Sequence, residues 1–587
     1  MKILLVALNA KYIHSNLAVY SLMSFAKKYN TELGFTEMTI NHSEEDILKE
    51  IYKEKADVVA FSCYIWNINI IRRISLELKK VAPEVKIWFG GPEVSFDMEQ
   101  CLQDNPQLDG IMYGEGEQSF LELAGYYIEE KGELKNIHGL AFKESAKLTK
   151  DREKGKAPGD INTPAEPMHL DDIPFPYQDM EAFRNRIIYY ESSRGCPFSC
   201  SYCLSSVDKK VRLRSLELVK EELKIFLDYK VPQVKFVDRT FNCNKKHAMG
   251  IWKYIKENDN GITNFHFEIA ADLLEEDEIE FLASLRPGQV QLEIGVQSTN
   301  SDTVEAIRRK MDFTKVAGNV NKIKAGGNIH QHLDLIAGLP LEGYDSFEKS
   351  FSEVYALKPD QLQLGFLKIL KGSPMEMDKE RYGIVFRSVA PYEVLFTSNL
   401  SYEEVLRLKG VCEMVEVYYN SGQFVNSIKF LEHFYPSPME LYQRISNYYE
   451  SAGKAMQAHN RIKRYEILLD FFKEVVIESI AKADTALLPV FEEILLLDLY
   501  LREDLKSRPA FSPVKLPQKE LRLLYDKYKE DHKTIHIERF QYDVLGSAAS
   551  GTAIQRETII LFDYANRNIL SRAANIQILG LPSIDNN

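Results

Sequence analysis

Three of the seven cysteines in the chain lie within eight residues, as Cys196, Cys200 and Cys203. Three thiolates can hold three irons of a [4Fe–4S] cluster and leave the fourth iron for an external ligand. Soft thiolates favour iron–sulfur or zinc over hard cations. A structural zinc site would need a fourth ligand, for which Cys243 is the nearest spare thiol, and a redox disulfide is the other alternative. The spacing favours the cluster, so we take these three cysteines as both metal ligands and catalytic residues.

The overall composition is that of an ordinary globular protein. The 587 residues are 45% apolar and 27% charged, and 73 Lys and Arg against 86 Asp and Glu give a net charge of −13. That length predicts about three or four domains. The acidic balance argues against general nucleic-acid binding, which needs a basic surface, although a local basic patch for one tRNA or peptide stays open. Seven cysteines in so long a chain predict a reducing, cytoplasmic location.

Two apolar runs resemble membrane or export segments, and we reject both. No stretch reaches the ~18 uninterrupted apolar residues of a membrane span. Residues 487–501 come nearest, but Glu492 and Glu493 interrupt them. The N-terminal run, residues 3–8, is too short for a signal peptide. We expect no membrane association.

Short apolar runs alternate with helical patterns over the first 130 residues. The runs are residues 3–7, 58–62, 86–89 and 110–113, with a weaker one near 35–40. Helical patterns cover residues 17–27, 44–53 and 70–81. Continuous apolar strands covered by helices on both faces predict a doubly wound, Rossmann-like parallel sheet. Ligands of such sheets bind beyond the carboxyl ends of the strands.

The loops after these strands carry polar and glycine residues suited to a large flat or phosphorylated ligand. The alternative is that the glycines only make tight turns. No G-x-G-x-x-G follows the first strand, so a dinucleotide site is unsupported. The loop residues are Asn9, Lys11 and Tyr12, then Ser62, Tyr64 and Trp66, then Gly90, Gly91, Pro92, Glu93 and Val94, then Gly114, Glu115, Gly116 and Glu117.

The pairing of the GGP loop with the GEGE loop resembles the cobalamin-binding domain at the front of one radical S-adenosylmethionine (SAM) subfamily. The resemblance implies that the loop residues above contact cobalamin. The usual D-x-H-x-x-G cobalt-ligand motif is absent, because the first loop reads NAKYIHSN. The family pattern then implies a displaced nucleotide tail and no cobalt ligand from that motif. His14 lies in the right loop at the wrong spacing, and we interpret it as structural.

C-x3-C-x2-C with an aromatic residue, here Tyr202, before the last cysteine is the signature of the radical SAM superfamily. The resemblance implies that the open iron binds the amino and carboxylate groups of SAM, whose reductive cleavage gives a 5′-deoxyadenosyl radical. Further strands follow in βα alternation, at residues 234–238, 265–271, 290–295, 332–337 and 361–367. With the strand before the cysteines they make six, which predicts the open, TIM-type partial (β/α)6 barrel of this family.

Several polar residues on these strands resemble SAM contacts of the superfamily. Glu268 occupies a third-strand place, and Glu293, Gln297 and Ser298 form an E-x-G-x-Q-S pattern on the fourth strand. Backbone near Tyr202, and residues 336–340, resemble segments that meet adenine. Asp238, Arg239 and Asp272 are weaker site-lining candidates. The alternative for each is a strand-end residue that faces solvent.

The chain is expected to divide at residues 1–135, a cobalamin-binding α/β domain; 136–182, a linker with a short hairpin; 183–375, the barrel; and 376–587. The last part shows long amphipathic helices and a late β segment near residues 534–544 and 557–564. It resembles an uncharacterised domain (DUF4080-like) appended to cobalamin-dependent radical SAM proteins. His532 and His536 are spaced i, i+4, and we favour a solvated surface over a metal site for them.

The resemblance implies a cobalamin-dependent radical SAM enzyme with three cofactors: a [4Fe–4S] cluster, SAM and cobalamin. The favoured activity is a class B methyltransferase acting on an unactivated carbon or phosphorus centre. A rearrangement or cyclisation without methyl transfer, and a non-catalytic iron–sulfur binding or sensor module, remain alternatives. The electron donor is expected to be a flavodoxin or ferredoxin. The substrate is not predicted.

Overall fold

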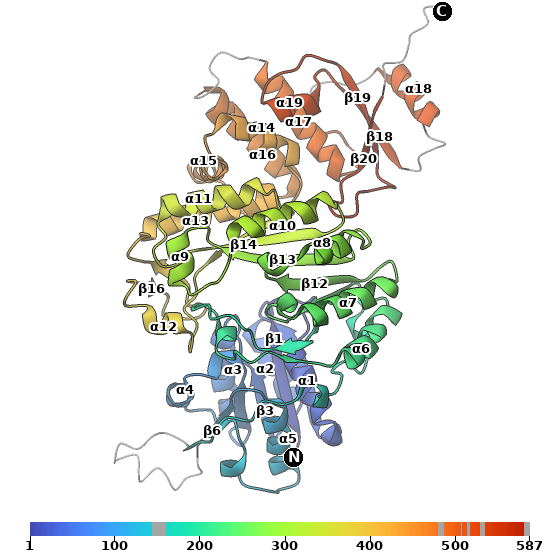
Figure 1. Cartoon of the computed structure of the whole chain (residues 1–587). Helices are drawn as coiled ribbons and strands as arrows, with labels where there is room; N and C mark the ends of the chain where they lie inside the picture. Colours follow the sequence, from blue (N-terminus) through green and yellow to red (C-terminus); the bar gives the residue numbers. More distant parts are fainter. Residues whose placement is uncertain (144–159, 479–485, 506, 513–516, 529–533, 580–587) are drawn as a thin grey trace, which may run out of the picture.

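The computed structural model describes residues 1–143, 160–478, 486–505, 507–512, 517–528 and 534–579. Figure 1 shows an N-terminal α/β unit (blue) below a central sheet with its helices (green to yellow), and C-terminal helices with a small sheet (orange to red) above. Residues 144–159 of the expected linker, and His532, fall outside the described residues. Within the described part, no helix is both long and apolar enough to cross a membrane.

The N-terminal sheet begins with five parallel strands in the order β2-β1-β3-β4-β5. The chain order changes direction between β1 and β3, which is where ligands of such sheets bind. Strand β1 is buried along its whole length because helices cover both faces. The expected Rossmann-like sheet is therefore confirmed. The strands are β1 (Ile3–Asn9), β2 (Leu33–Thr39), β3 (Val58–Ser62), β4 (Lys86–Gly90) and β5 (Gly110–Met112).

Two hydrophobic clusters hold the helices on this sheet. Helices α1 (Leu17–Phe25) and α5 (Glu117–Ile128) pack on one face. On the other face lie α2 (Glu44–Lys53), α3 (Ile68–Val81) and α4 (Met98–Asp104). The strand-end loops are thus fixed between two layers of helices.

Strands β6 (Leu140–Phe142) and β7 (Asp160–Ile161) differ from the sequence-based expectation of a hairpin inside a linker. They pair antiparallel with each other, and β6 pairs antiparallel with β5. All three residues of β6 are buried. Burial of this apolar run at the free edge of β5 makes the hairpin part of the first sheet.

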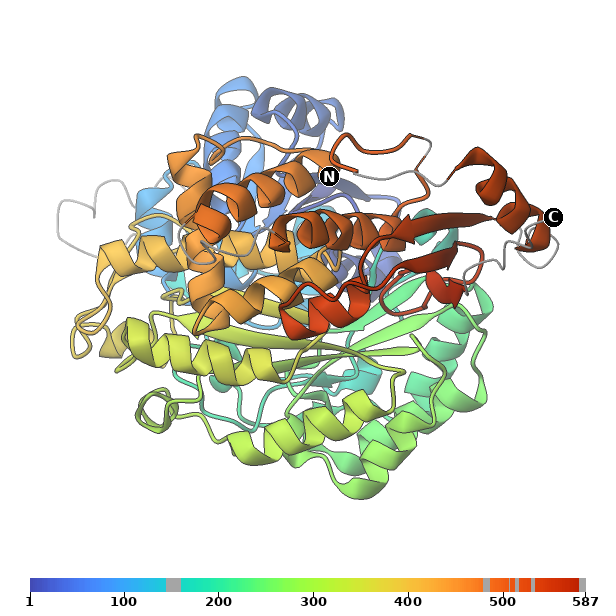
Figure 2. The ribbon, with the colours of Figure 1, turned by 90° about the horizontal axis from the view of Figure 1, so that it is seen from above.

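The central sheet has six parallel strands in the order β15-β14-β13-β12-β11-β8. Helices α6 to α11 lie on the outer side of these strands (Figure 2). The side chains of β13 alternate strictly between buried and partly exposed, so one face of the sheet is core and the other is the barrel interior. The six-stranded partial barrel is confirmed. Its strands are β8 (Ile188–Tyr190), β11 (Gln233–Phe236), β12 (Asn264–Ile269), β13 (Val290–Gln297), β14 (His330–Ala337) and β15 (Gln361–Phe366).

The outer helices are α6 (Leu216–Asp228), α7 (Lys245–Glu257), α8 (Glu276–Ala283), α9 (Ser301–Ala306), α10 (Phe313–Ala325) and α11 (Tyr344–Ala356). After β15 come α12 (Pro374–Asp378) and the hairpin of β16 (Val385–Phe386) and β17 (Val394–Phe396). The C-terminal helices follow. They are α13 (Tyr402–Val415), α14 (Val425–Leu431), α15 (Pro438–Ser451), α16 (Arg461–Phe471), α17 (Leu487–Arg502), α18 (Gln518–Tyr528) and α19 (Val544–Ser550). All but α18 share one hydrophobic core with the barrel, and α18 packs on the small C-terminal sheet.

The most apolar run of the chain, residues 487–501, forms helix α17. This helix is apolar on nearly all sides because nearly all sides are buried within the C-terminal core. Strands β18 (Ile535–Phe540) and β19 (Thr558–Asp563) pair antiparallel, as expected, and β20 (Asn575–Leu579) adds an unexpected third strand. His536 lies on β18 and stacks on Tyr500 at 3.9 Å between ring centroids, so it is not part of a helical i, i+4 pair.

Candidate functional site

The cysteine loop is closed at its base by strands β9 (Ser193–Arg194) and β10 (Arg212–Leu213), which pair antiparallel. The Cys196 backbone N–H donates to the Asp208 carbonyl at 2.9 Å. Gly195 has φ +92°, and a Cβ there would lie 2.5 Å from the Lys210 carbonyl oxygen, so only glycine fits before the first cysteine. All seven cysteines are free thiols in the structure.

Asp238, at the end of β11, anchors the residues that lead into this loop. Its carboxylate accepts from the Ser192 N–H at 3.0 Å, the Ser192 hydroxyl at 2.7 Å and the Ser193 hydroxyl at 2.5 Å. Asp238 is buried. The structure therefore gives this residue a supporting position beneath the loop rather than the site-lining one considered from the sequence.

Arg309 contacts the cysteine loop, and the sequence analysis did not identify it. Its guanidinium donates to the Cys200 Sγ at 3.7 Å, to the Tyr202 hydroxyl at 3.3 Å and to the Gly295 carbonyl at 2.5 Å. Burial raises the pKa of the Cys200 thiol, and the Arg309 charge opposes that rise. A fixed cation beside a thiolate cluster stabilises its negative charge.

The side chains of Gln297 and Ser298, which are adjacent in the fourth-strand motif, have different surroundings. Gln297 has φ +72°, and its buried side-chain oxygen has no hydrogen-bond partner among the described residues. It lies beside Gly295, close to Arg309. The Ser298 side chain is fully buried and donates to Glu342 at 2.6 Å. Of the two, Gln297 is the one with free polar capacity near the cysteine loop.

Glu268 and Glu293 lie in register on β12 and β13 and face the barrel interior. The Glu293 carboxylate lies 2.9 Å from Lys235 Nζ and 2.9 Å from His266 Nε2. Burial alone would raise the pKa of Glu293, but these two partners outweigh burial and lower it to about 2. Burial and the charge of Glu293 raise the pKa of Glu268 to about 7. Glu293 lies about 13 Å along the strand from Gln297, so it belongs to a deeper layer than the cysteine loop.

A cavity of about 810 Å³ lies between the carboxyl edge of the first sheet and the start of the barrel. Its size is within the usual range for ligand pockets. Barrel residues Tyr189, Glu191, Arg194 and Arg239 line it from one side. The predicted loop residues that line it from the other side are Asn9, Ser62, Tyr64, Trp66, Gly90, Gly91, Pro92, Gly114, Glu115, Gly116 and Glu117.

The other four predicted loop residues do not line this cavity. Lys11 and Tyr12 are exposed, and Arg186 lies 5.1 Å from the Tyr12 ring centroid. Glu93 accepts a hydrogen bond from the Tyr392 hydroxyl at 2.6 Å, and Val94 is buried in the core. A short 3-10 helix at Pro92–Val94 turns both side chains away from the strand ends.

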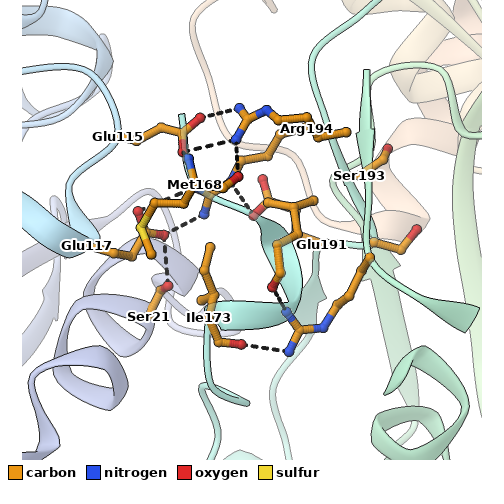
Figure 3. Close-up of polar contacts among 12 residues, drawn as sticks. Ser21, Glu115, Glu117, Met168, Ile173, Glu191, Ser193 and Arg194 are labelled. Atoms are coloured by element: carbon orange, nitrogen blue, oxygen red, sulfur yellow. Dashed lines mark hydrogen bonds and ion pairs between the residues drawn. The ribbon is translucent and has the colours of Figure 1, made fainter. Parts of the chain in front are cut away.

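The glutamates of the GEGE loop bind arginines that flank the cysteine loop (Figure 3). Arg194 lies 2.5 Å from Glu117 and 3.2 Å from Glu115, and Arg212 also pairs with Glu115. Burial would raise the pKa of Glu117, but the Arg194 charge outweighs burial and lowers it. Ion pairs therefore join the first sheet to the barrel at the cavity edge.

His14 makes a second link across the cavity. Its Nδ1 lies 2.7 Å from the Tyr189 hydroxyl, and both residues line the cavity. Burial lowers the pKa of His14, which favours a neutral imidazole. On β8, Tyr189 lies in register with Lys235 of β11. The loop after β1 thus reaches the polar interior of the barrel through one hydrogen bond.

Three parts of the chain match known family models. Residues 3–124 match the B12 binding domain, residues 190–354 match the radical SAM superfamily, and residues 380–562 match a protein of unknown function, DUF4080. The expected family assignment is therefore confirmed for these three regions.

The curated relatives include methyltransferases and cyclases. An uncharacterised methyltransferase of Pyrococcus horikoshii is 33% identical over 36% of this chain and 46% of its own length. The cobalamin-dependent radical SAM methyltransferase TokK of Streptomyces tokunonensis is 25% identical over 56% of this chain and 49% of its length. The anaerobic magnesium-protoporphyrin IX monomethyl ester cyclase of Rubrivivax gelatinosus is 22% identical over 55% and 58%. The chain thus spans about half the length of the curated relatives that it matches.

A solved structure extends the likeness of the fold. The cobalamin-dependent S-adenosylmethionine radical enzyme OxsB, with aqua-cobalamin and S-adenosylmethionine bound, superposes with a TM-score of 0.57 at 17% identity. The match covers 85% of this chain and 80% of that one. The likeness at this identity is one of fold.

Proposed function

Because this chain is a radical SAM protein with a B12-binding domain before its barrel and a DUF4080 domain after it, we propose that it is a cobalamin-dependent radical SAM methyltransferase. The observation that carries the proposal is a cavity that is lined both by the strand ends of the first sheet and by residues at the start of the barrel. A ligand held there lies against the barrel side on which the cysteine loop begins.

The residues present fit the three cofactors. Cys196 and Cys200 are buried, Cys203 is partly exposed, and Arg309 supplies a cation to the loop. Gln297 offers an unpartnered oxygen near the same loop. The flat strand-end surface, with small residues at Ser62, Gly90 and Gly114, suits the corrin ring of cobalamin.

We propose that the three cysteines hold the [4Fe–4S] cluster and that Tyr202 and Gln297 lie beside SAM, while Glu268 and Glu293 form the deeper polar layer of the barrel. Ser298 would act indirectly, by fixing the strand end through Glu342. When bound, the cluster and SAM supply a substrate radical, and cobalamin supplies the methyl group. The cavity-lining loop residues named above would hold cobalamin and exclude water. His14 is engaged by Tyr189 through Nδ1, so we assign it a positioning role.

The substrate is proposed to carry the methyl acceptor on an unactivated carbon or a phosphorus centre. We also propose a flavodoxin or ferredoxin as electron donor and a cytoplasmic location. Seven free cysteines and an iron–sulfur site suit a reducing compartment. The methyltransferase names of two relatives support methylation over other outcomes.

A second candidate function is a radical cyclisation in which cobalamin binds without donating methyl. Three cyclases among the relatives support it. Product analysis separates the two. The reconstituted chain, incubated anaerobically with reductant, methyl-deuterated SAM and cell extract, should form both 5′-deoxyadenosine and S-adenosylhomocysteine and should deuterate a product. Deoxyadenosine without homocysteine would favour cyclisation, and neither product would leave a binding or sensor module.

A further inference from the structure

A cluster of polar side chains lies inside the barrel, deeper than the cysteine loop. Glu293 of β13 is in register with His332 of β14, and Gly295 is in register with Asp334. Glu293, His332 and Asp334 each offer one ligand atom, and these three atoms all lie within 4.8 Å of one another. They come from two adjacent strands of a rigid sheet, so their positions are fixed by the fold.

Two imidazole nitrogens in this cluster lie close to carboxylate oxygens. His332 Nε2 lies 3.0 Å from Asp334 Oδ1, and His266 Nε2 lies 2.9 Å from a Glu293 oxygen. Both histidines are 6% exposed, yet His332 Nε2, Asp334 Oδ1 and His266 Nε2 have no hydrogen-bond partner within the described structure. A hydrogen bond needs an N–H directed at the oxygen. Buried nitrogen and oxygen atoms this close together, without an aligned hydrogen bond, suit a shared cation.

The charges inside the barrel leave room for a cation. Three carboxylates, from Glu268, Glu293 and Asp334, face this interior. The groups that act on them are Lys235, which pairs with Glu293, Arg239, which acts on Glu268, and two imidazoles. The His266 imidazole lies 2.9 Å from Glu293, and the His332 imidazole lies 3.0 Å from Asp334. A metal-bound imidazole is neutral, so Lys235 and Arg239 are then the two fixed cations that face three carboxylates. Bound positive charge would stabilise the ionised forms.

We propose that Glu293, His332 and Asp334, with His266 beside them, bind a divalent transition-metal ion inside the barrel, separate from the cysteine site. Imidazole and carboxylate ligands together suit zinc, iron(II) or manganese, whereas calcium and magnesium prefer oxygen ligands alone. The site is independent of the proposed methyl transfer, because its ligands do not include the cysteines. It assigns Glu293 to the metal rather than to direct contact with SAM.

The test uses the full-length, tag-free chain with Cys196→Ala, Cys200→Ala and Cys203→Ala, purified without cobalamin. The three alanines remove the thiolates that would otherwise take up the probe. Anaerobic titration with Co²⁺, followed by its visible d–d absorption, should show one saturable ion per chain that Zn²⁺ displaces. No thiolate-to-cobalt charge-transfer band should appear, because the ligands are nitrogen and oxygen.

Adding His332→Ala or Asp334→Asn to this variant should weaken Co²⁺ binding at least about tenfold, since loss of even an outer-shell partner costs ten- to a hundredfold. His138→Ala, outside the barrel, is the matched control and should leave binding unchanged. If a ligand variant does not fold, the triple Cys→Ala parent still tests the proposal by itself, because saturating Co²⁺ should raise the melting temperature of the parent. Absence of Co²⁺ binding to the parent, or equal binding by the ligand variants, would overturn the proposal.

Discussion

The Arg194 guanidinium lies 2.5 Å from the Glu117 carboxylate, so the residue two positions before the first cysteine is paired with the loop that follows β5. Arg194 is 16% exposed and Glu117 is 5% exposed at the side chain. Glu191 and Glu115 bind the same guanidinium. A buried pair of this kind makes the position of the cysteine loop depend on the position of the B12-binding sheet.

Arg194→Ala should destabilise the protein strongly. Removing one partner of a buried ion pair costs about 3–5 kcal/mol, because the other charge stays buried without compensation. We expect a melting temperature several degrees lower and weaker cobalamin binding. The matched control is Arg308→Ala, which breaks a more exposed pair with Asp378 and should cost at most about 1 kcal/mol. Equal melting temperatures for the two variants would contradict the structural role of Arg194.

Cobalamin binding should depend on the small side chain of Ser62. Ser62→Leu adds bulk at the cavity wall, and overpacking of about 1–3 kcal/mol lowers affinity by about tenfold or more. The measurement is anaerobic titration with hydroxocobalamin, followed by quenching of tryptophan fluorescence. Thr36→Leu, on β2 and away from the cavity, is the control and should bind as the parent does.

The quenching itself should come largely from Trp66, which stacks on Tyr64 at 4.3 Å and lines the cavity. Trp66→Phe should therefore lose part of the signal while absorbance titration still shows binding. Full quenching in this variant would place cobalamin elsewhere. Gly91 is a poor probe, because a Cβ there would lie 2.6 Å from the Cys63 carbonyl oxygen and would disturb the fold.

Arg309→Ala should lower the reduction potential of the cluster, because a cation beside the Cys200 thiolate favours the more negative, reduced state. It should also slow SAM cleavage by about tenfold or more, as a charged hydrogen bond is worth about 1.5–3 kcal/mol. Arg309→Lys keeps the charge and should restore most of the potential. Redox titration followed by EPR checks both variants. An unchanged potential in Arg309→Ala would remove this residue from the site.

Glu342 should make stability depend on pH. Burial raises its pKa to about 7, although Ser298 and Ser350 donate to it. Between pH 4.5 and 7 the folded state binds more protons than the unfolded state, so stability falls as pH rises through this window. Glu342→Gln removes that loss and should be more stable than the parent at pH 8, by up to about 3 kcal/mol.

Thermal unfolding at pH 5 and pH 8 measures the effect of Glu342→Gln. The advantage of the variant should be present at pH 8 and small at pH 5. Glu353→Gln, at a more exposed position on helix α11, which follows Glu342, should show no such pH dependence. An advantage of Glu342→Gln that is equal at both pH values would show that the ionisation of Glu342 is not its cause.

The sequence alone predicts much of the fold because burial leaves a regular pattern. Strand β3 and helix α2 have the predicted bounds, since an apolar run and a 3.6-residue period are local signals. Strand β20 was not predicted. Ile576 and Ile578 alternate with polar residues, but the run is short and four of its five residues are exposed, so its placement depends on pairing with the distant strand β19. The hairpin of β6 and β7 was predicted, but its pairing with β5 was not. That pairing depends on tertiary packing, which the local sequence does not show.

The same limit applies to the candidate site. The cysteines stand close together in the sequence, so their spacing alone predicts a common ligand. Arg309 contacts Cys200 only through the folding of the barrel, and nothing in its local sequence marks it. Glu93 lies in a strand-end loop as predicted, yet one turn of 3-10 helix directs it to Tyr392 instead of the cavity. The sequence pattern predicts where a loop lies, whereas the direction of its side chains depends on tertiary packing.

The most direct test of the central claim is an anaerobic crystal structure of the chain loaded with iron, sulfide, SAM and hydroxocobalamin. We predict one corrin ring in the cavity between the strand ends of the first sheet and the barrel, in contact with Gly114, Ser62 and Tyr189. We predict the cluster on Cys196, Cys200 and Cys203, on the barrel side of that ring. Cobalamin bound outside this cavity, or a cavity without cobalamin beside an intact cluster, would contradict the account.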